Sequence, residues 1–150
     1  MFKFKELTVY KKAFALAMEI FDVSKKFPPE EKYDLTSQIR RSSRSVCTSI
    51  GEGYRKRHYP AFFVSKVSDA DMENTETHIW TDFAFNCKYI SEEIKNSWYL
   101  QSHEMGKLLN HMIENPEKYQ RGGTAASSNN KKYPNINCLL NICLLSTEIT

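Results

Sequence analysis

The sequence predicts an all-α protein: an antiparallel, up-and-down four-helix bundle that self-associates. Apolar residues recur at spacings of three and four in four separate segments, which is the pattern of amphipathic helices. Proline and cap residues fall between the segments, and the connections are short. A chain of 150 residues with 41% hydrophobic residues can bury one core, and we expect the bundle to occupy residues 1–120.

The first helix is expected over residues 6–26. One apolar stripe runs along it, formed by Val9, Ala13, Leu16, Ala17, Ile20, Ser24 and Phe27. Pro28 and Pro29 end this helix, because proline lacks a backbone donor and restricts the residue before it. The second helix then begins near Glu30, with acidic residues in its first turns that complement the helix dipole, and runs to about Arg57.

Side chains of the second helix separate by type at about 100° per residue. The predicted core face holds Leu35, Ile39, Ser43, Val46 and Ile50. One flank is lined by the small residues Ser42, Ser45, Ser49 and Gly53, which predict a close approach of the next helix. The serine hydroxyls would match the polar centre of that helix. The basic residues form a candidate phosphate-binding face and its extension at the helix end: Arg40, Arg41, Arg44, Arg55, Lys56 and Arg57.

The third helix, expected over residues 60–90, has two apolar faces. The first holds Phe63, Val67, Ala70, Asn74, Thr77, Thr81 and Phe85. The second holds Phe62, Met72, Ile79, Trp80, Phe83, Cys87 and Ile90. A helix in a monomeric four-helix bundle needs only one buried stripe, so the second face predicts self-association.

The fourth helix is expected to follow a cap at Ser91 and to end at Asn115, before Pro116. Its apolar stripe holds Ile94, Trp98, Met105, Leu108, Met112 and Ile113. Residues 121–150 read as a linker followed by a short apolar tail, and we expect them to be poorly ordered. The apolar run of this tail is too short to span a bilayer.

No motif predicts catalysis, a cofactor or a metal site. Di-iron bundles use Glu-x-x-His, but no glutamate lies three residues before His78, His103 or His111. The four cysteines form no C-x-x-C pair, and Cys47 and Cys87 are expected to be buried structural thiols. No apolar run follows the N-terminus, so we expect no secretion signal, no membrane partner and a cytoplasmic protein with reduced thiols.

Five motifs, taken in order, resemble one family of bacterial proteins. They are Phe4–Ala13, Phe27–Ser42, Ser49–Lys56, Ser68–Asp71 and Asn115–Tyr119. Over residues 2–120 the chain resembles the four-helix-bundle family of 23S rRNA-intervening-sequence proteins, which includes the accessory variability proteins of diversity-generating retroelements. The resemblance implies a ring-like homopentamer without enzymatic activity that is linked to nucleic acid. Its retroelement members look like reverse-transcriptase partners with basic, RNA- or DNA-binding surfaces.

The chain departs from this family at one point in the second helix. The family usually has Asn-Ile-Ala-Glu where this chain has Ser-Ile-Gly-Glu at residues 49–52. A glycine in a helix interior costs roughly 1 kcal/mol relative to alanine. Gly51 is therefore expected to loosen the second helix.

Two interpretations of the basic face remain open. In the first, its arginines bind phosphates of RNA or DNA, and a ring would repeat the surface in every subunit. In the second, Asp69, Glu73 and Glu76 of the third helix neutralise the arginines, which then serve assembly. The protein would in that case be a scaffold that recruits a partner such as a reverse transcriptase. Residues 1–60 carry 13 basic and 7 acidic side chains, and residues 61–120 carry 5 and 10, which suits either interpretation.

Two further expectations concern the end of the second helix. Residues 55–58 lie at the hairpin end, away from most acids, so their basic side chains are expected to stay available. Only Tyr54 and Tyr59 bring aromatic rings to the basic face, so strong stacking with single-stranded nucleic acid is not indicated.

Overall fold

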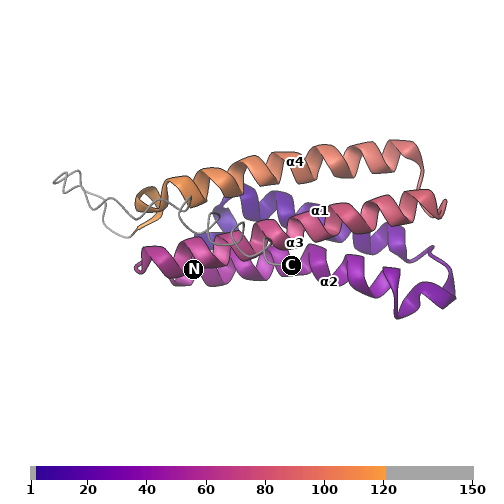
Figure 1. Ribbon diagram of the computed structural model, residues 1–150, viewed down its shortest axis with the longest axis horizontal. Helices are drawn as coiled ribbons and strands as arrows, with labels where there is room; N and C mark the ends of the chain where they lie inside the picture. Colours follow the sequence, from indigo (N-terminus) through magenta and orange to yellow (C-terminus); the bar gives the residue numbers. More distant parts are fainter. Residues whose placement is uncertain (1–2, 121–150) are drawn as a thin grey trace, which may run out of the picture.

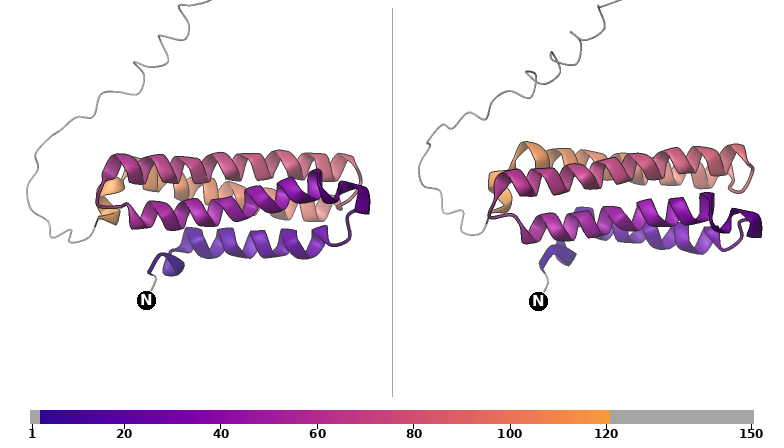
Figure 2. Two further views of the ribbon diagram at one scale, coloured as in Figure 1. Left: turned by 90° about the horizontal axis from the view of Figure 1, so that it is seen from below. Right: turned by 60° about the horizontal axis from the view of Figure 1, so that its bottom comes forward.

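The computed structural model describes residues 3–120, which form a bundle of four long helices (Figures 1 and 2). These are α1 (Thr8–Ser24), α2 (Leu35–Arg55), α3 (Pro60–Asn86) and α4 (Glu92–Glu114). Three 3-10 turns flank them: η1 (Lys3–Glu6), η2 (Pro29–Lys32) and η3 (Pro116–Tyr119). Successive helices are antiparallel neighbours, and α1 also packs on α4. The predicted all-α four-helix bundle is confirmed, whereas the linker and tail predicted at 121–150 lie outside the described residues.

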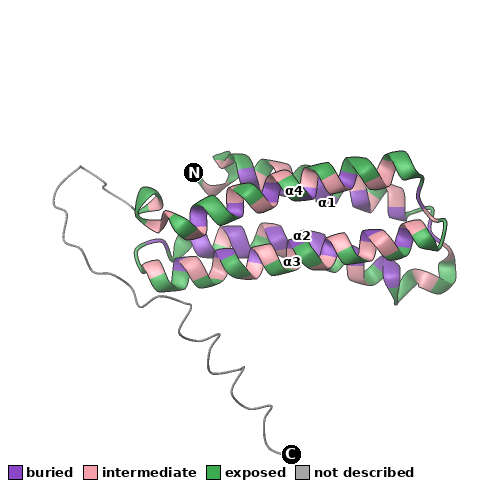
Figure 3. Ribbon diagram, turned by 45° about the horizontal axis from the view of Figure 1, so that its top comes forward, coloured by how far each residue is buried: buried purple, intermediate pink, exposed green. Residues whose placement is uncertain are grey.

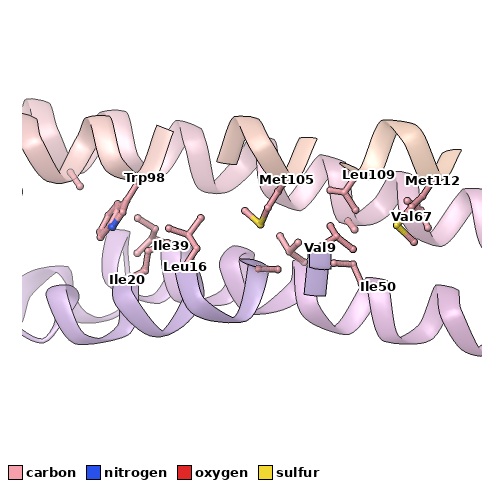
Figure 4. Packing of buried hydrophobic residues seen from close by; sticks show 14 of the residues in the cluster. Val9, Leu16, Ile20, Ile39, Ile50, Val67, Trp98, Met105, Leu109 and Met112 are labelled. Carbon is pink, nitrogen blue, oxygen red and sulfur yellow. The ribbon is translucent and has the colours of Figure 1, made fainter. Parts of the chain in front are cut away.

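The core runs along the bundle where the apolar stripes of the four helices meet (Figures 3 and 4). Every residue predicted for the stripe of the first helix and for the core face of the second is buried. On α4 the predicted stripe was wrong at three positions, because Ile94, Leu108 and Ile113 are only half-buried. Leu109, which was not predicted, is buried. The buried residues of α4 follow an alternating spacing of four and three: Trp98, Ser102, Met105, Leu109 and Met112. Ser102 was missed because it is polar.

Two helix boundaries differ from the prediction, each for a local reason. The acidic residues predicted to begin the second helix form the separate turn η2. Oε2 of Glu31 in this turn accepts a hydrogen bond from the backbone N–H of Leu35 at 3.2 Å, at the start of α2. α3 ends at Asn86 because Lys88 adopts a left-handed conformation with a φ of 65°. The backbone N–H of Tyr89 then reaches back to the carbonyl of Ala84 at 2.9 Å, which closes the helix end.

Buried polar pairs fix the register of α3 against its neighbours. The hydroxyl of Thr77 donates to Oγ of Ser42 on α2 at 2.9 Å, as the polar match with the small flank predicted. On the α4 side, Nδ2 of Asn74 donates to the carbonyl of Ser102 at 3.0 Å, and the Ser102 hydroxyl returns a bond to Oδ1 of Asn74 at 3.0 Å. Such pairs cost free energy when broken, because each partner is left buried and unpaired.

The predicted second face of α3 lies on the outside of the bundle. Its large exposed side chains are Phe62, Met72, Ile79 and Phe83. Ile90 was assigned to this face wrongly: it follows the end of α3 and is buried in the core. Within residues 3–120 no helix has the length and apolar character needed to cross a membrane.

Candidate nucleic-acid interface

The six basic side chains predicted to form one surface occupy three different environments. The first is that of Arg41, which faces α3. Its Nη2 atom lies 2.5 Å from Oε1 of Glu76, and its Nη1 atom lies 3.7 Å from Oε1 of Glu73. The predicted pairing of arginines with acids of the third helix is therefore confirmed for Arg41, within the chain. Arg41 helps to hold α2 against α3 and has less of its charge to offer a ligand.

The groove beside Arg41 is acidic. It has a volume of about 360 Å³ and lies between α2 and α3. Four carboxylates line it against one lysine: Glu52, Asp69, Glu73 and Glu76. Nζ of that lysine, Lys66, lies 2.8 Å from Glu52 and 3.3 Å from Asp69. Burial raises the pKa of Glu73, although Arg41 opposes the shift. This side of α2 does not suit a polyanion.

The second environment belongs to Arg40 and Arg44, on the flank of α2 that faces α1. Their guanidinium carbons lie 5.0 and 5.3 Å from the ring centroid of Phe21 on α1. Nε of Arg40 also donates to Oγ of Ser24 at 2.7 Å. Neither arginine forms an ion pair with another residue in the 3–120 range. Cation–π contact positions the two guanidinium groups while most of their N–H donors stay available to a ligand.

The third environment is the end of α2. Arg55 and Lys56 are exposed, but the expectation that Arg57 stays available was wrong, because only 6% of it is exposed. Nη1 of Arg57 donates to the carbonyl of Tyr54 at 2.5 Å, and its guanidinium lies 4.1 Å from the Tyr54 ring centroid. α2 ends at Arg55, so Arg57 no longer follows the helical spacing and turns back onto the bundle.

Sequence reasoning missed the aromatic residues that α1 places beside the basic flank of α2. We call the combined surface the α1–α2 seam, defined by Tyr10, Phe14 and Phe21 of α1 and by Arg40, Arg44 and Arg55 of α2. The two helices lie side by side (Figure 2). A signal existed in the sequence, since the three aromatic residues are spaced by four and seven and so share one flank of a helix.

A groove with a volume of about 430 Å³ occupies one end of the seam. It is lined by Phe4, Tyr10, Cys47, Thr48, Gly51, Glu52 and Arg55. The ring of Phe4 packs against the Gly51 backbone and lies edge-on to Tyr10, with centroids 5.1 Å apart. Burial raises the pKa of Cys47 to about 11, so its thiol is protonated at neutral pH. Cys47 is half-buried, whereas Cys87 is exposed and not buried as predicted.

A larger groove, of about 540 Å³, lies between α3 and α4. His78 at its edge stacks on Tyr99, with ring centroids 3.8 Å apart. The Tyr99 hydroxyl donates to Asp82, and burial is the main cause that raises the pKa of Tyr99 to about 12. Burial also raises the pKa of Asp71, which lines the groove. Over residues 3–120, no three His, Cys, Asp or Glu side chains gather in a way that could hold a metal ion.

Comparison with known proteins supports the resemblance seen in the sequence. The model of the 23S rRNA-intervening sequence protein family matches residues 5–111. A crystal structure of a protein of unknown function from the S23 ribosomal protein family of Bacteroides thetaiotaomicron is 30% identical, with a TM-score of 0.64. The match covers 71% of this chain and 95% of that chain. No curated protein matches the chain. The chain belongs to the 23S rRNA-intervening sequence protein family.

Proposed function

We propose that this protein is a non-enzymatic, homo-oligomeric accessory protein that binds the phosphate backbone of RNA or DNA. The observation that carries the proposal is the pair formed by Arg40 and Arg44, both held over Phe21 and both without an acidic partner within residues 3–120. Guanidinium groups fixed in this way match the planar, bidentate geometry of phosphate oxygens. The family's association with 23S rRNA intervening sequences is consistent with such a ligand.

The phosphate contacts proposed here are Arg40, Arg44, Arg55 and Lys56. Arg41 and Arg57 leave the set, because Arg41 pairs with Glu76 and the Arg57 side chain is buried. The two flanks of α2 then have opposite character: the flank toward α1 is basic, and the groove toward α3 is acidic. A polyanion would approach along the α1 side.

The proposal of a binding protein fits the state of the half-buried thiol. A cysteine nucleophile works as the thiolate. Burial raises the pKa of Cys47 to about 11, so the reactive form is scarce at neutral pH. None of the residues lining its groove is a histidine that could act as a base.

The test is fluorescence anisotropy of the full chain with labelled RNA and DNA over a series of salt concentrations. Binding through phosphates releases counterions, so affinity should fall steeply as salt rises. The double variant Arg40→Gln/Arg44→Gln should bind more weakly, with a salt slope smaller by about 1.5.

Arg41→Gln is the matched control, since it removes one charge from the same helix but from the flank that faces α3. It should change the salt slope less than either single substitution at Arg40 or Arg44. An affinity that is unaffected in the double variant, with the assembly intact by light scattering, would refute this assignment of the surface. Equal effects of all three substitutions would show that only net charge matters.

The exposed face of α3 supports a second candidate function, a protein–protein scaffold. Met72, Ile79 and Phe83 place apolar side chains on one outer strip of this helix. We propose that this strip is the contact between subunits, with five subunits as the family resemblance implies, and that the assembly could recruit a partner such as a reverse transcriptase. Ile79→Lys should reduce the mass measured by light scattering and leave the helix content unchanged. A variant of unchanged mass would count against this contact.

A further inference from the structure

The α1–α2 seam brings aromatic rings and unpaired arginines together. We propose that it binds single-stranded nucleic acid, with an unpaired base stacked on Phe14 and the adjoining phosphates held by Arg44 and Arg55. The inference rests on the proposed function, since it specifies the form of nucleic acid that the same surface takes. It also reverses the sequence-based expectation that stacking is not indicated, because the aromatic residues come from a helix that the basic segment does not include.

The orientation of α1 places its aromatic flank toward α2. Its opposite flank is occupied by α4: Nζ of Lys12 lies 2.6 Å from Oε2 of Glu104. On the same side, Oε2 of Glu19 accepts a hydrogen bond from Gln101 at 2.9 Å. The contact of Phe21 with the arginines of α2 marks the other flank directly. Phe14, seven residues before Phe21, lies on that flank at about 100° per residue.

Phe14 presents the accessible ring of the seam. It is 52% exposed, so its ring is open to a ligand. The ring lies nearly parallel to that of Tyr10, at an interplanar angle of 18° and a centroid distance of 6.2 Å. Tyr10 and Arg55 both line the groove at one end of the seam. A base stacked on Phe14 therefore has arginines on both sides along α2, at Arg44 and Arg55.

Two acids of α1 and α2 near the seam, Asp22 and Glu52, are paired with lysines. Oδ1 of Asp22 lies 2.7 Å from Nζ of Lys25, whose ammonium also lies 4.5 Å from the ring centroid of Phe21. Oε2 of Glu52 lies 2.8 Å from Nζ of Lys66, on the α3 side of α2. The arginines therefore give the seam a positive charge, which complements the negative charge of a phosphate chain.

The combination favours a single strand over a duplex. In a duplex the bases stack on one another and expose only their edges and the phosphates, so an exposed phenylalanine ring gains no stacking partner. A single strand can place bases on aromatic rings while its phosphates follow a positively charged track. Stacking of this kind tolerates any base, so the seam is expected to have little sequence preference.

The test compares the full chain with its Phe14→Leu variant by fluorescence anisotropy. The probes are labelled oligo(dT), oligo(rU) and a DNA duplex of equal length; the first two separate DNA from RNA. Leucine keeps apolar volume at an exposed position but removes the π-face. We expect Phe14→Leu to weaken binding of at least one single-stranded probe by about fivefold or more, and to change duplex binding by less than about twofold. Tyr33→Leu, which removes an exposed aromatic ring outside the seam, should change neither.

The outcomes separate this inference from the function on which it rests. If Phe14→Leu binds both single strands as tightly as the unmodified protein while the salt-dependent binding persists, the stacking inference is overturned and phosphate binding stands. If the unmodified protein binds none of the probes at low salt, the proposed function fails and the inference fails with it. A lower mass by light scattering for Phe14→Leu would show that a second copy covers the seam, which would also overturn the inference.

Discussion

Two glycines of α2, two residues apart, provide a matched test of how this bundle packs. Gly51 and Gly53 are both inside the helix, where replacing glycine by alanine gains about 1 kcal/mol of stability from backbone entropy. Their surroundings differ. A Cβ at Gly51 would meet the ring carbons of Phe4 at 3.5 to 3.7 Å, which is ordinary van der Waals contact. A Cβ at Gly53 would meet Cβ of Lys66 on α3 at 3.3 Å and Cγ2 of Val67 at 3.5 Å.

We expect the two alanine substitutions to have clearly different effects. Gly51→Ala should stabilise the protein by about 1 kcal/mol, which corresponds to a rise in Tm of roughly 3–5 °C for a domain of this size. At Gly53 the new methyl group presses on a Cβ fixed to the α3 backbone, so the helices must separate by a few tenths of an ångström. Overpacking of this kind costs about 1–3 kcal/mol, which cancels or exceeds the helix-propensity gain.

The assay is urea denaturation followed by far-UV circular dichroism, with both variants at the same protein concentration as the unmodified chain. Fixing the concentration is necessary because association would shift the apparent stability. The reasoning is refuted if Gly53→Ala stabilises the protein as much as Gly51→Ala, since the close approach of α2 and α3 would then not limit the site. Destabilisation by Gly51→Ala would show that Phe4 cannot accommodate the added methyl group.

Three further predictions concern single groups. Lys88→Gly should raise stability by about 1 kcal/mol in thermal denaturation, because Lys88 holds a φ of 65° at the end of α3, and a loss would contradict this account of the helix end. Burial raises the pKa of Asp71, so the stability it contributes is present below the unfolded carboxyl pKa and is lost as pH rises through the folded pKa. Asp71→Asn should therefore stabilise the protein near pH 7 and have little effect near pH 4. A change in denaturation midpoint on substitution that is the same at both pH values would contradict this. Alkylation at pH 8, followed by peptide mass spectrometry, should modify Cys87 well before Cys47, whose pKa is about 11, and the reverse order would contradict it.

Helical periodicity was enough to predict the four helices and most of their buried faces. Apolar stripes with spacings of three and four can be satisfied only by a helix packed along that stripe, so the core faces of α1 and α2 follow directly from the residue order. Errors occurred where a local interaction ended the pattern. The left-handed Lys88 ended α3 early, and the buried bond between Ser102 and Asn74 made a polar residue part of the core.

The candidate site could be predicted only in part. The arginines and their common helix were evident in the sequence, but a linear pattern does not say which neighbour covers each flank. Arg41 and Arg44 are only three positions apart on α2 but contact different helices. The first meets glutamates of α3, and the second meets the ring of Phe21 on α1.

The sequence by itself determined the fold class, the helix faces and the presence of a basic segment, because each of these depends on spacing along one chain. The tertiary structure decided which charges are neutralised and which rings lie beside the remaining arginines. That choice depends on the packing of α2 between α1 and α3, where contacts join residues far apart in sequence. Local periodicity carries no information on such contacts, so the acidic groove and the α1–α2 seam emerged only when the helices were placed together.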